Sequence, residues 1–392
     1  MLVVSGMLWQ AHSGCAYYCI VHTYWQAGSE ATMYEATDQT STAAEHPDGS
    51  EIRESDWHIL AGFWHPVAFS SELSDGPVAS RLLDVDLVVY RTSEGVAVAR
   101  DLCVHRGSKL SGGWISDDGA CIVCPYHGLH YDRSGQCTWI PANPPDRPAP
   151  PKTMRLVSYL AAERYGIVWA CMKPEPLRPL PDWPHLDEFG PEWLKIQIPK
   201  GTWAATASRH CENFNDIAHI SWVHMKTFGN RARPVVPDYT LEQTDYGLYM
   251  ALPYIEVERG FNDDLGERER EVFYQHHLTY PFATDLRVDY YEDDGESFVT
   301  SHFFDIGSPV SARTTDIYQV SLTNIPGATV EDYAEYQLVT NSEDVVIVEG
   351  QCPEAVPLNL AAEVHIPADK LSIRYRRDLV EIFGLGSPEL VA

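Results

Sequence analysis

The sequence predicts an α+β fold in which a small antiparallel β domain precedes a second domain, built from a sheet with flanking helices. From Trp57 to about Ile167, short runs rich in β-forming residues alternate with turn sequences such as Asp118-Gly119 and Ser134-Gly135. From about Gly201 onward, strand-like alternation is mixed with helical segments. These two patterns indicate two domains of different construction.

The individual elements follow from local patterns. The strands expected in the first domain are Leu82–Tyr90, Gly95–Leu102, Ala120–Val123 and Leu129–Asp132. The second domain contains an expected helix over Arg209–Lys226 and strand-like runs at Leu286–Tyr291 and Phe298–Phe304. Thr329 with Asp332 resembles a capping box, which predicts a long helix that begins there and continues to about Gly350.

Composition divides the chain into three parts. Residues 1–55 are expected to be a disordered leader, because Glu35–Asp56 is too polar to bury a core. Residues 56–160 would form the first domain and residues 161–392 the second, with the proline-rich stretch Pro141–Pro151 leading out of the first.

Charge and cysteine content exclude several classes of protein. A net charge of −28 without a Lys/Arg cluster argues against a nucleic-acid partner. Apolar runs are too short for a membrane span, which needs roughly 20 residues. Nine cysteines, an odd number in a long chain, do not form a secreted disulfide framework and fit a cytoplasmic location. Seven of them are therefore expected to be free thiols: Cys15, Cys19, Cys121, Cys137, Cys171, Cys211 and Cys352.

Two short loops each contain one cysteine and one histidine. The first is Cys103-Val104-His105 and the second Cys124-Pro-Tyr-His127, each followed by a turn glycine. A zinc knuckle also uses two of each residue, but it usually pairs cysteine with cysteine and histidine with histidine. One thiolate and one imidazole per loop favour a Rieske [2Fe–2S] cluster, in which two cysteines bind one iron and two histidines the other.

A second group of polar residues occupies the expected helix: Asn213, Asp216, His219 and His224. Histidines five positions apart reach one metal only if the helix is distorted, for example by a π-bulge. Most helical histidines are solvated or hydrogen-bonded rather than metal ligands. A Rieske cluster, however, stores an electron and has no open position for O2, so a partner iron with two histidines and one carboxylate is the expected complement.

Both motifs resemble those of the Rieske non-heme iron oxygenases, in the family's order, across about Trp57 to Leu385. The resemblance implies that Cys103 and Cys124 bind one cluster iron and His105 and His127 the other. Val104 and Leu129 depart from the family's usual Pro and Trp. The family resemblance also implies a helix-grip catalytic domain.

For the mononuclear Fe(II), the resemblance implies His219, His224 and a distant carboxylate, which we assign to Asp344, with Glu343 and Glu349 as rivals. Asp216 would orient His219 and bridge to His127 of a neighbouring subunit, which implies a head-to-tail homotrimer.

The implied function is that of a terminal oxygenase component. No G-x-G-x-x-G fingerprint occurs, so a separate reductase or ferredoxin must supply electrons. The tail from Glu363 to Leu379 resembles demethylating monooxygenases and saxitoxin-pathway hydroxylases, which favours hydroxylation or oxidative demethylation of a small aromatic or heterocyclic compound. The alternatives are a cis-dihydroxylating dioxygenase, an oxidative cyclase, or a Rieske electron carrier without oxygenase activity.

The substrate pocket has only weak sequence candidates. Aromatic and apolar residues on the expected strands could line it or could simply belong to the core. They are Tyr280, Phe282, Leu286, His302 and Phe304.

Overall fold

The computed structural model describes residues 44–147, 149–187, 189–258, 268–291 and 298–387 of the chain. Of the expected leader, residues 1–43 lie outside this description, as do Cys15 and Cys19. Ala44 donates its backbone N–H to the carbonyl of Met172, at 3.1 Å. The Ser50 hydroxyl donates to Asp84, at 2.7 Å. The end of the expected leader is therefore held against the first domain by polar contacts that composition does not reveal.

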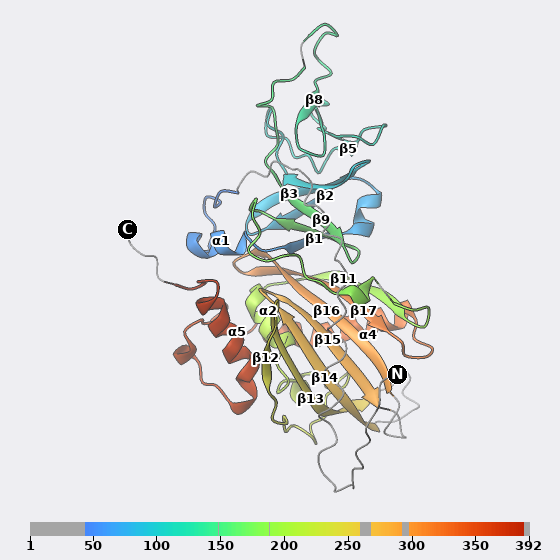
Figure 1. Ribbon diagram of the computed structural model, residues 1–392, viewed down its shortest axis with the longest axis vertical. Helices are drawn as coiled ribbons and strands as arrows, with labels where there is room; N and C mark the ends of the chain where they lie inside the picture. Colours follow the sequence, from blue (N-terminus) through green and yellow to red (C-terminus); the bar gives the residue numbers. More distant parts are fainter. Residues whose placement is uncertain (1–43, 148, 188, 259–267, 292–297, 388–392) are drawn as a thin grey trace, which may run out of the picture. The chain divides into compact units, whose positions relative to one another are not determined.

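The first domain contains a six-stranded antiparallel sheet in the order β1-β10-β9-β4-β3-β2 (Figure 1). A four-stranded sheet, β5-β6-β7-β8, is inserted between β4 and β9. It shares with β3 a separate core that contains Tyr90, Cys103 and Tyr131. The elements are α1 Glu54–Leu60, β1 His65–Phe69, η1 Ser70–Ser74, β2 Val78–Leu82, β3 Val85–Thr92, β4 Gly95–Arg100, β5 Trp114–Ile115, β6 Ile122–Val123, β7 His130–Tyr131, β8 Cys137–Trp139, β9 Ser158–Arg164 and β10 Ile167–Cys171.

The sheet of the first domain extends beyond the boundary that the sequence suggested at residue 160. Strand β9 pairs with β4, with Tyr159 opposite Val98, and β10 continues the sheet to Cys171. The prolines of residues 141–151 lie in the excursion between β8 and β9. Proline content therefore marks a loop inside the domain, whereas strand pairing, which is not local in sequence, sets its end.

The second domain is built on a seven-stranded antiparallel sheet in the order β11-β17-β16-β15-β14-β13-β12. The expected strands at Leu286–Tyr291 and Phe298–Phe304 belong to β15 and β16. Its elements are η2 Pro184–Leu186, β11 Leu194–Trp203, α2 Ala207–Phe214, α3 Ile220–Val223, β12 Leu241–Gln243, β13 Gly247–Glu258, β14 Arg268–Thr279, β15 Ala283–Tyr291, β16 Phe298–Ser311, β17 Thr314–Thr323, α4 Val330–Val348, η4 Leu360–Ala362, η5 Pro367–Asp369 and α5 Lys370–Glu381.

The predicted long helix is confirmed as α4. The Thr329 hydroxyl accepts the backbone N–H of Asp332 at 3.1 Å, which caps the first turn. The predicted helix over Arg209–Lys226 is wrong as a single element, because the chain leaves the helix after Phe214 and re-enters one at Ile220.

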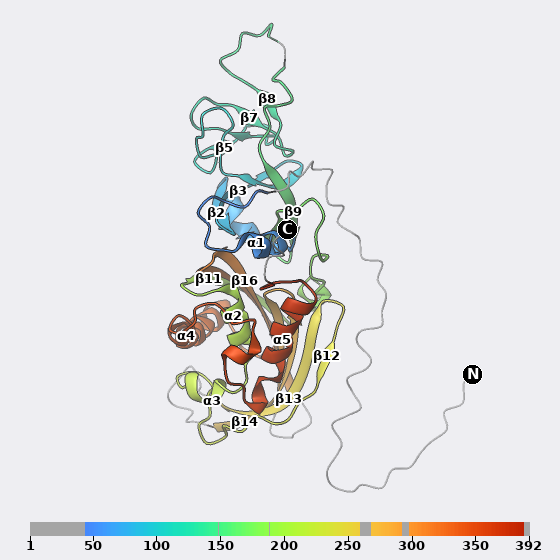
Figure 2. The same cartoon turned by 90° about the vertical axis from the view of Figure 1, so that its left-hand side faces the viewer.

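Helices α2, α4 and α5 cover one face of the seven-stranded sheet (Figures 1 and 2). On the opposite face, Phe304 and Tyr318 of β16 and β17 pack with Phe69 and Trp169 of the first domain. Alternate residues of β16 and β17 therefore face opposite ways, one set toward the helices and the other toward the first domain.

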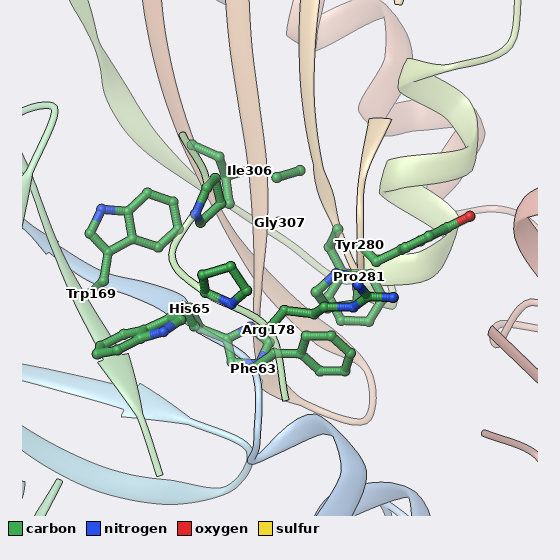
Figure 3. A pocket seen from close by; sticks show the side chains of 13 residues that line it. Phe63, His65, Trp169, Arg178, Tyr280, Pro281, Ile306 and Gly307 are labelled. Carbon is green, nitrogen blue, oxygen red and sulfur yellow. The ribbon is translucent and has the colours of Figure 1, made fainter. Parts of the chain in front are cut away.

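Hydrogen bonds cross the junction of the two domains. The backbone N–H of Leu83 donates to Pro309 at 2.8 Å, and the Ser308 hydroxyl donates to Pro66 at 2.7 Å. Figure 3 shows the side chains around a cavity of about 20 Å³ between them. Such a space holds about one water molecule. It is far too small for an organic substrate.

The described part of the chain has no disulfide among its cysteines, which are Cys103, Cys121, Cys124, Cys137, Cys171, Cys211 and Cys352. None of the helices in this part is long and apolar enough to cross a membrane.

Candidate active site

The two Cys/His loops have the same backbone construction. Gly107 and Gly128 adopt positive φ angles of 72° and 66°, and their N–H groups donate to the carbonyls of Cys103 and Cys124 at 2.9 and 3.0 Å. A side chain would be strained at either glycine. The repeated turn presents a cysteine and, two or three residues later, a histidine at the tip of each loop.

Burial separates the cysteines from the histidines. Cys103 and Cys124 are 2% and 1% exposed, whereas His105 and His127 lie at the surface with ring centroids 4.6 Å apart. The Tyr131 hydroxyl lies 3.1 Å from the Cys103 sulfur. Burial, together with Cys103, raises the pKa of Tyr131, so the hydroxyl keeps its proton and can donate to a thiolate. The donor set fits a cluster with one inner and one outer iron.

His219 and His224 stand at the two ends of α3, a single helical turn over Ile220–Val223. Their Nε2 atoms are 3.1 Å apart, although a continuous helix would place the two residues about 140° apart around its axis. Gly229 closes the turn that follows, because its N–H donates to the His224 carbonyl at 2.6 Å. A β-carbon at Gly229 would lie 2.6 Å from the Ile220 carbonyl oxygen, so only glycine fits.

Asp344 on α4 completes a group of three possible metal ligands. Its carboxylate lies 3.4 Å from His219 Nε2 and 3.5 Å from His224 Nε2. Glu349 lies elsewhere and accepts the backbone N–H of Ala204. Of the three carboxylates that the sequence proposed, Asp344 alone is grouped with both histidines.

A second carboxylate stands behind each histidine. Asp216 lies 3.3 Å from His219 Nδ1, and Glu343, one of the rivals, lies 3.5 Å from His224 Nδ1. Glu343 is itself held by Thr227 and by the backbone N–H of Lys226, each at 2.7 Å. The orienting contact of Asp216 follows the expectation, whereas that of Glu343 was missed because residue 343 is remote from His224 in sequence.

The charges around this group favour a cation. Burial alone would lower the pKa of His219, but Asp216 and Asp344 raise it to about 10. A divalent metal would replace that proton as the positive charge. Three donors 3.1 to 3.5 Å apart suit bonds of about 2.0–2.2 Å, and two histidines with one carboxylate are the donor set of non-heme Fe(II).

A cavity of about 380 Å³ borders these three residues. Its apolar wall comes from α3, the following turn and the sheet, and its volume suits a small organic molecule. Polar groups of α4 and β14 interrupt that wall. Representative members are Phe228, Leu286, Val288, Phe303, Gln337 and Asn341.

Only Leu286, among the sequence candidates for the pocket, lines this cavity. Tyr280 and Phe282 border the small junction cavity. Phe304 is fully buried on the opposite face of the sheet, where His302 also lies. Aromatic character on a strand does not say which face meets the cavity.

His276 is a further polar residue of the cavity that the sequence did not single out. Asn215 donates its amide N–H groups to Cys211 and Thr284, both at 2.8 Å, which turns its oxygen toward His276 Nδ1 at 3.3 Å. Nδ1 therefore carries the proton and Nε2 is an acceptor with no partner among the described protein groups. Burial lowers the pKa of His276 to about 3, so the ring is uncharged at neutral pH.

Comparison with known proteins covers both domains. Residues 63–160 match the Rieske [2Fe–2S] domain, and residues 203–382 match the vanillate O-demethylase oxygenase C-terminal domain. The methylxanthine N1-demethylase NdmA of Pseudomonas putida is 30% identical over 338 residues, which are 82% of this chain and 89% of that protein. The chain belongs to the Rieske non-heme iron oxygenases.

Other relatives agree with this assignment. The methylxanthine N3-demethylase NdmB of the same organism is 26% identical over 327 residues, 81% of this chain and 88% of that protein. The solved structure of NdmA with caffeine superposes with a TM-score of 0.70 at 27% identity, covering 84% of this chain and 92% of that one. Dicamba monooxygenase, at 19% identity and a TM-score of 0.65, shares the fold over 83% of this chain and 98% of its own.

The family resemblance and the α+β fold predicted from the sequence are thus confirmed. This Rieske oxygenase is the terminal oxygenase component of its system and a monooxygenase, and a separate protein supplies its electrons. It uses a Rieske [2Fe–2S] cluster and a mononuclear iron. The cluster supplies single electrons and the mononuclear iron supplies an open position for O2. A Rieske electron carrier without oxygenase activity is excluded by the match to the catalytic domain.

Substitutions on α4 separate a ligand from an orienting residue. We expect Asp344→Ala to leave about two irons per chain instead of about three, because the cluster keeps its own ligands. Glu343→Gln should keep the third iron but hold it roughly 10–100-fold more weakly. Glu349→Gln is the control and should match the unmodified protein. Metal analysis across a chelator series measures all three; full iron in Asp344→Ala with loss in Glu343→Gln would reverse the two roles.

Proposed function

We propose that this oxygenase oxidatively demethylates a small, flat aromatic or heterocyclic compound that carries an N- or O-methyl group. The observation that carries the proposal is the cavity of about 380 Å³, bordered on one side by His219, His224 and Asp344 and elsewhere mainly by apolar side chains. The names of two relatives, both methylxanthine demethylases, support the same chemistry.

The reaction balances with one O2 and two electrons from the donor protein. One oxygen atom enters a methyl C–H bond to give a hydroxymethyl group, and the other leaves as water with two protons. The hydroxymethyl compound then releases formaldehyde and leaves N–H or O–H on the product. The apolar wall favours a neutral ring and excludes bulk water from the reacting methyl group.

Formaldehyde release tests the proposal. With reductant, an electron donor and a panel of methylxanthines and methoxybenzoates, we expect O2 uptake matched by formaldehyde and demethylated product for at least one compound. The His219→Ala variant should show no substrate-dependent O2 uptake. A hydroxylated product without formaldehyde, a cis-diol or a cyclised product would assign a different outcome to the same iron.

We propose that Cys103 and Cys124 bind the inner cluster iron and that His105 and His127 bind the outer one. The identical turns of the two loops and the surface position of both histidines support this. His219, His224 and Asp344 would hold the mononuclear iron, as their convergence suggests. The free cysteines of the described residues fit a cytoplasmic location.

We propose a head-to-tail homotrimer in which electrons cross between subunits. The small sheet contacts β3, whereas β1 and β2 contact β16 of the catalytic sheet. The six-stranded sheet of the first domain therefore lies between the cluster loops and the catalytic sheet (Figure 2). Leu102, Val104 and Tyr126 expose apolar surface beside His105 and His127. Trp222, six residues after Asp216 in the sequence, is 55% exposed and offers a matching apolar contact on a neighbouring subunit.

The Asp216→Asn variant tests whether electrons cross between subunits at Asp216. The change keeps the size of the side chain but removes the charge that would link His219 to His127 of a neighbour. Both metals should load, while turnover and the reoxidation of the reduced cluster should slow by roughly 10–100-fold. Asp245→Asn, another change at the surface, is the control. Metal content, oligomeric state and single-turnover absorbance are measured together, and an unchanged rate in a loaded trimer would rule out this route.

His276 should select substrates that carry a hydrogen-bond donor, because its free Nε2 can only accept. We expect His276→Phe to raise KM roughly tenfold for a substrate with a free N–H. The analogue methylated at that nitrogen is the matched control and should change little. Steady-state kinetics on the two compounds, with iron content measured for both proteins, decide this; equal shifts for both substrates would make His276 a packing residue.

A further inference from the structure

A second group of two histidines and one aspartate lies on the face of the sheet that points away from the cavity. Its members are His185 of η2, Asp285 of β15 and His302 of β16. Leu286, the neighbour of Asp285, lines the cavity on the other face. Because side chains alternate along a strand, this group is separate from the mononuclear iron site.

An imidazole nitrogen of each histidine lies close to the Asp285 carboxylate, as at the iron site with Asp344. His185 Nε2 lies 3.1 Å from one carboxylate oxygen of Asp285, and His302 Nδ1 lies 3.0 Å from the other. The corresponding imidazole–carboxylate separations at the iron site are 3.4 and 3.5 Å. One donor atom from each of the three residues lies within 4.8 Å of the others, which one metal ion can span.

The carboxylate of Asp285 is buried and needs a positive charge nearby. Its side chain is 5% exposed. The guanidinium of Arg287, on the next position of the same face, is bonded to Asp289 at 2.9 Å. His277 faces Asp285 across the ladder and adds a third imidazole rather than a fixed charge. The two carboxylate oxygens each contact an imidazole nitrogen, and a metal ion on the two flanking imidazoles would supply the compensating charge without protonating either ring.

The group packs against an aromatic ring and is partly exposed to solvent. The Phe304 ring stacks on His302 at 5.9 Å and lies 5.1 Å from the ring of His185. The side chain of His185 is 33% exposed, so an ion and its water ligand can reach the group from solvent. Imidazole nitrogens favour a transition metal over Ca2+ or Mg2+, which prefer oxygen ligands.

We propose that His185, Asp285 and His302 form a second metal site, which binds a divalent transition metal such as Zn2+. The three ligands come from η2, in the segment that joins the two domains, and from two strands of the catalytic sheet. The ion therefore links η2, in the segment that joins the two domains, to the catalytic sheet. Its role is structural, because the site faces away from the cavity.

Zinc binding to the iron-loaded protein tests the proposal. After incubation with Zn2+ and removal of free metal, the unmodified protein should hold about one more zinc per chain than His185→Ala, with the iron content equal in both. His58→Ala is the matched control, because His58 is a half-exposed histidine near an acidic residue, 3.8 Å from Glu54, and is not part of the group. It should bind zinc like the unmodified protein.

Anomalous diffraction at the zinc edge locates the ion, and Asp285→Asn provides a second variant that keeps the shape of the group. We expect a zinc peak between the three residues and a melting temperature that zinc raises in the unmodified protein but not in His185→Ala. No extra zinc in the unmodified protein, equal zinc in the unmodified protein and His185→Ala, or a peak elsewhere would each overturn the proposal and leave a hydrogen-bonded triad without metal. None of these outcomes depends on the demethylation assay.

Discussion

The single helical turn of α3, with His219 at its start and His224 at its end, is the constraint on which the catalytic site depends. A straight helix would send His219 and His224 in different directions, and α4 could then reach only one of them. The turn that follows α3 is fixed by Gly229, where the carbonyls of Ile220 and His224 leave no room for a β-carbon. A local backbone requirement therefore decides whether two distant segments can share one ion.

The electrostatics of the site follow from that geometry. Two imidazoles are surrounded by the carboxylates of Asp216, Glu343 and Asp344, so negative charge exceeds positive charge unless a cation is bound. The same carboxylates fix the ring orientations, because each Nδ1 faces one of them. Charge balance and ligand orientation are thus provided by the same few side chains.

Sequence predicted what is encoded locally. The cluster loops were recognisable because ligands and turn glycines lie within a few residues, as from Cys103 to Gly107, and α4 was recognisable from the Thr329 cap. Asp344 was chosen by family resemblance, since no spacing links it to His219. The domain boundary and the cavity wall depend on strand pairing and on which face of a strand is inside, so Leu286 could not be distinguished from Phe304 beforehand.

The division of the sheet into two faces has an evolutionary consequence. Residues such as Leu286, Val288 and Phe303 meet the cavity, while Phe304, on the other face, packs with the first domain and the joining segment. Substitutions on the cavity face can change which substrate binds without disturbing the packing of the sheet against the first domain, which holds the cluster loops. An alternating strand thus lets one scaffold diversify its chemistry while its architecture stays under separate selection.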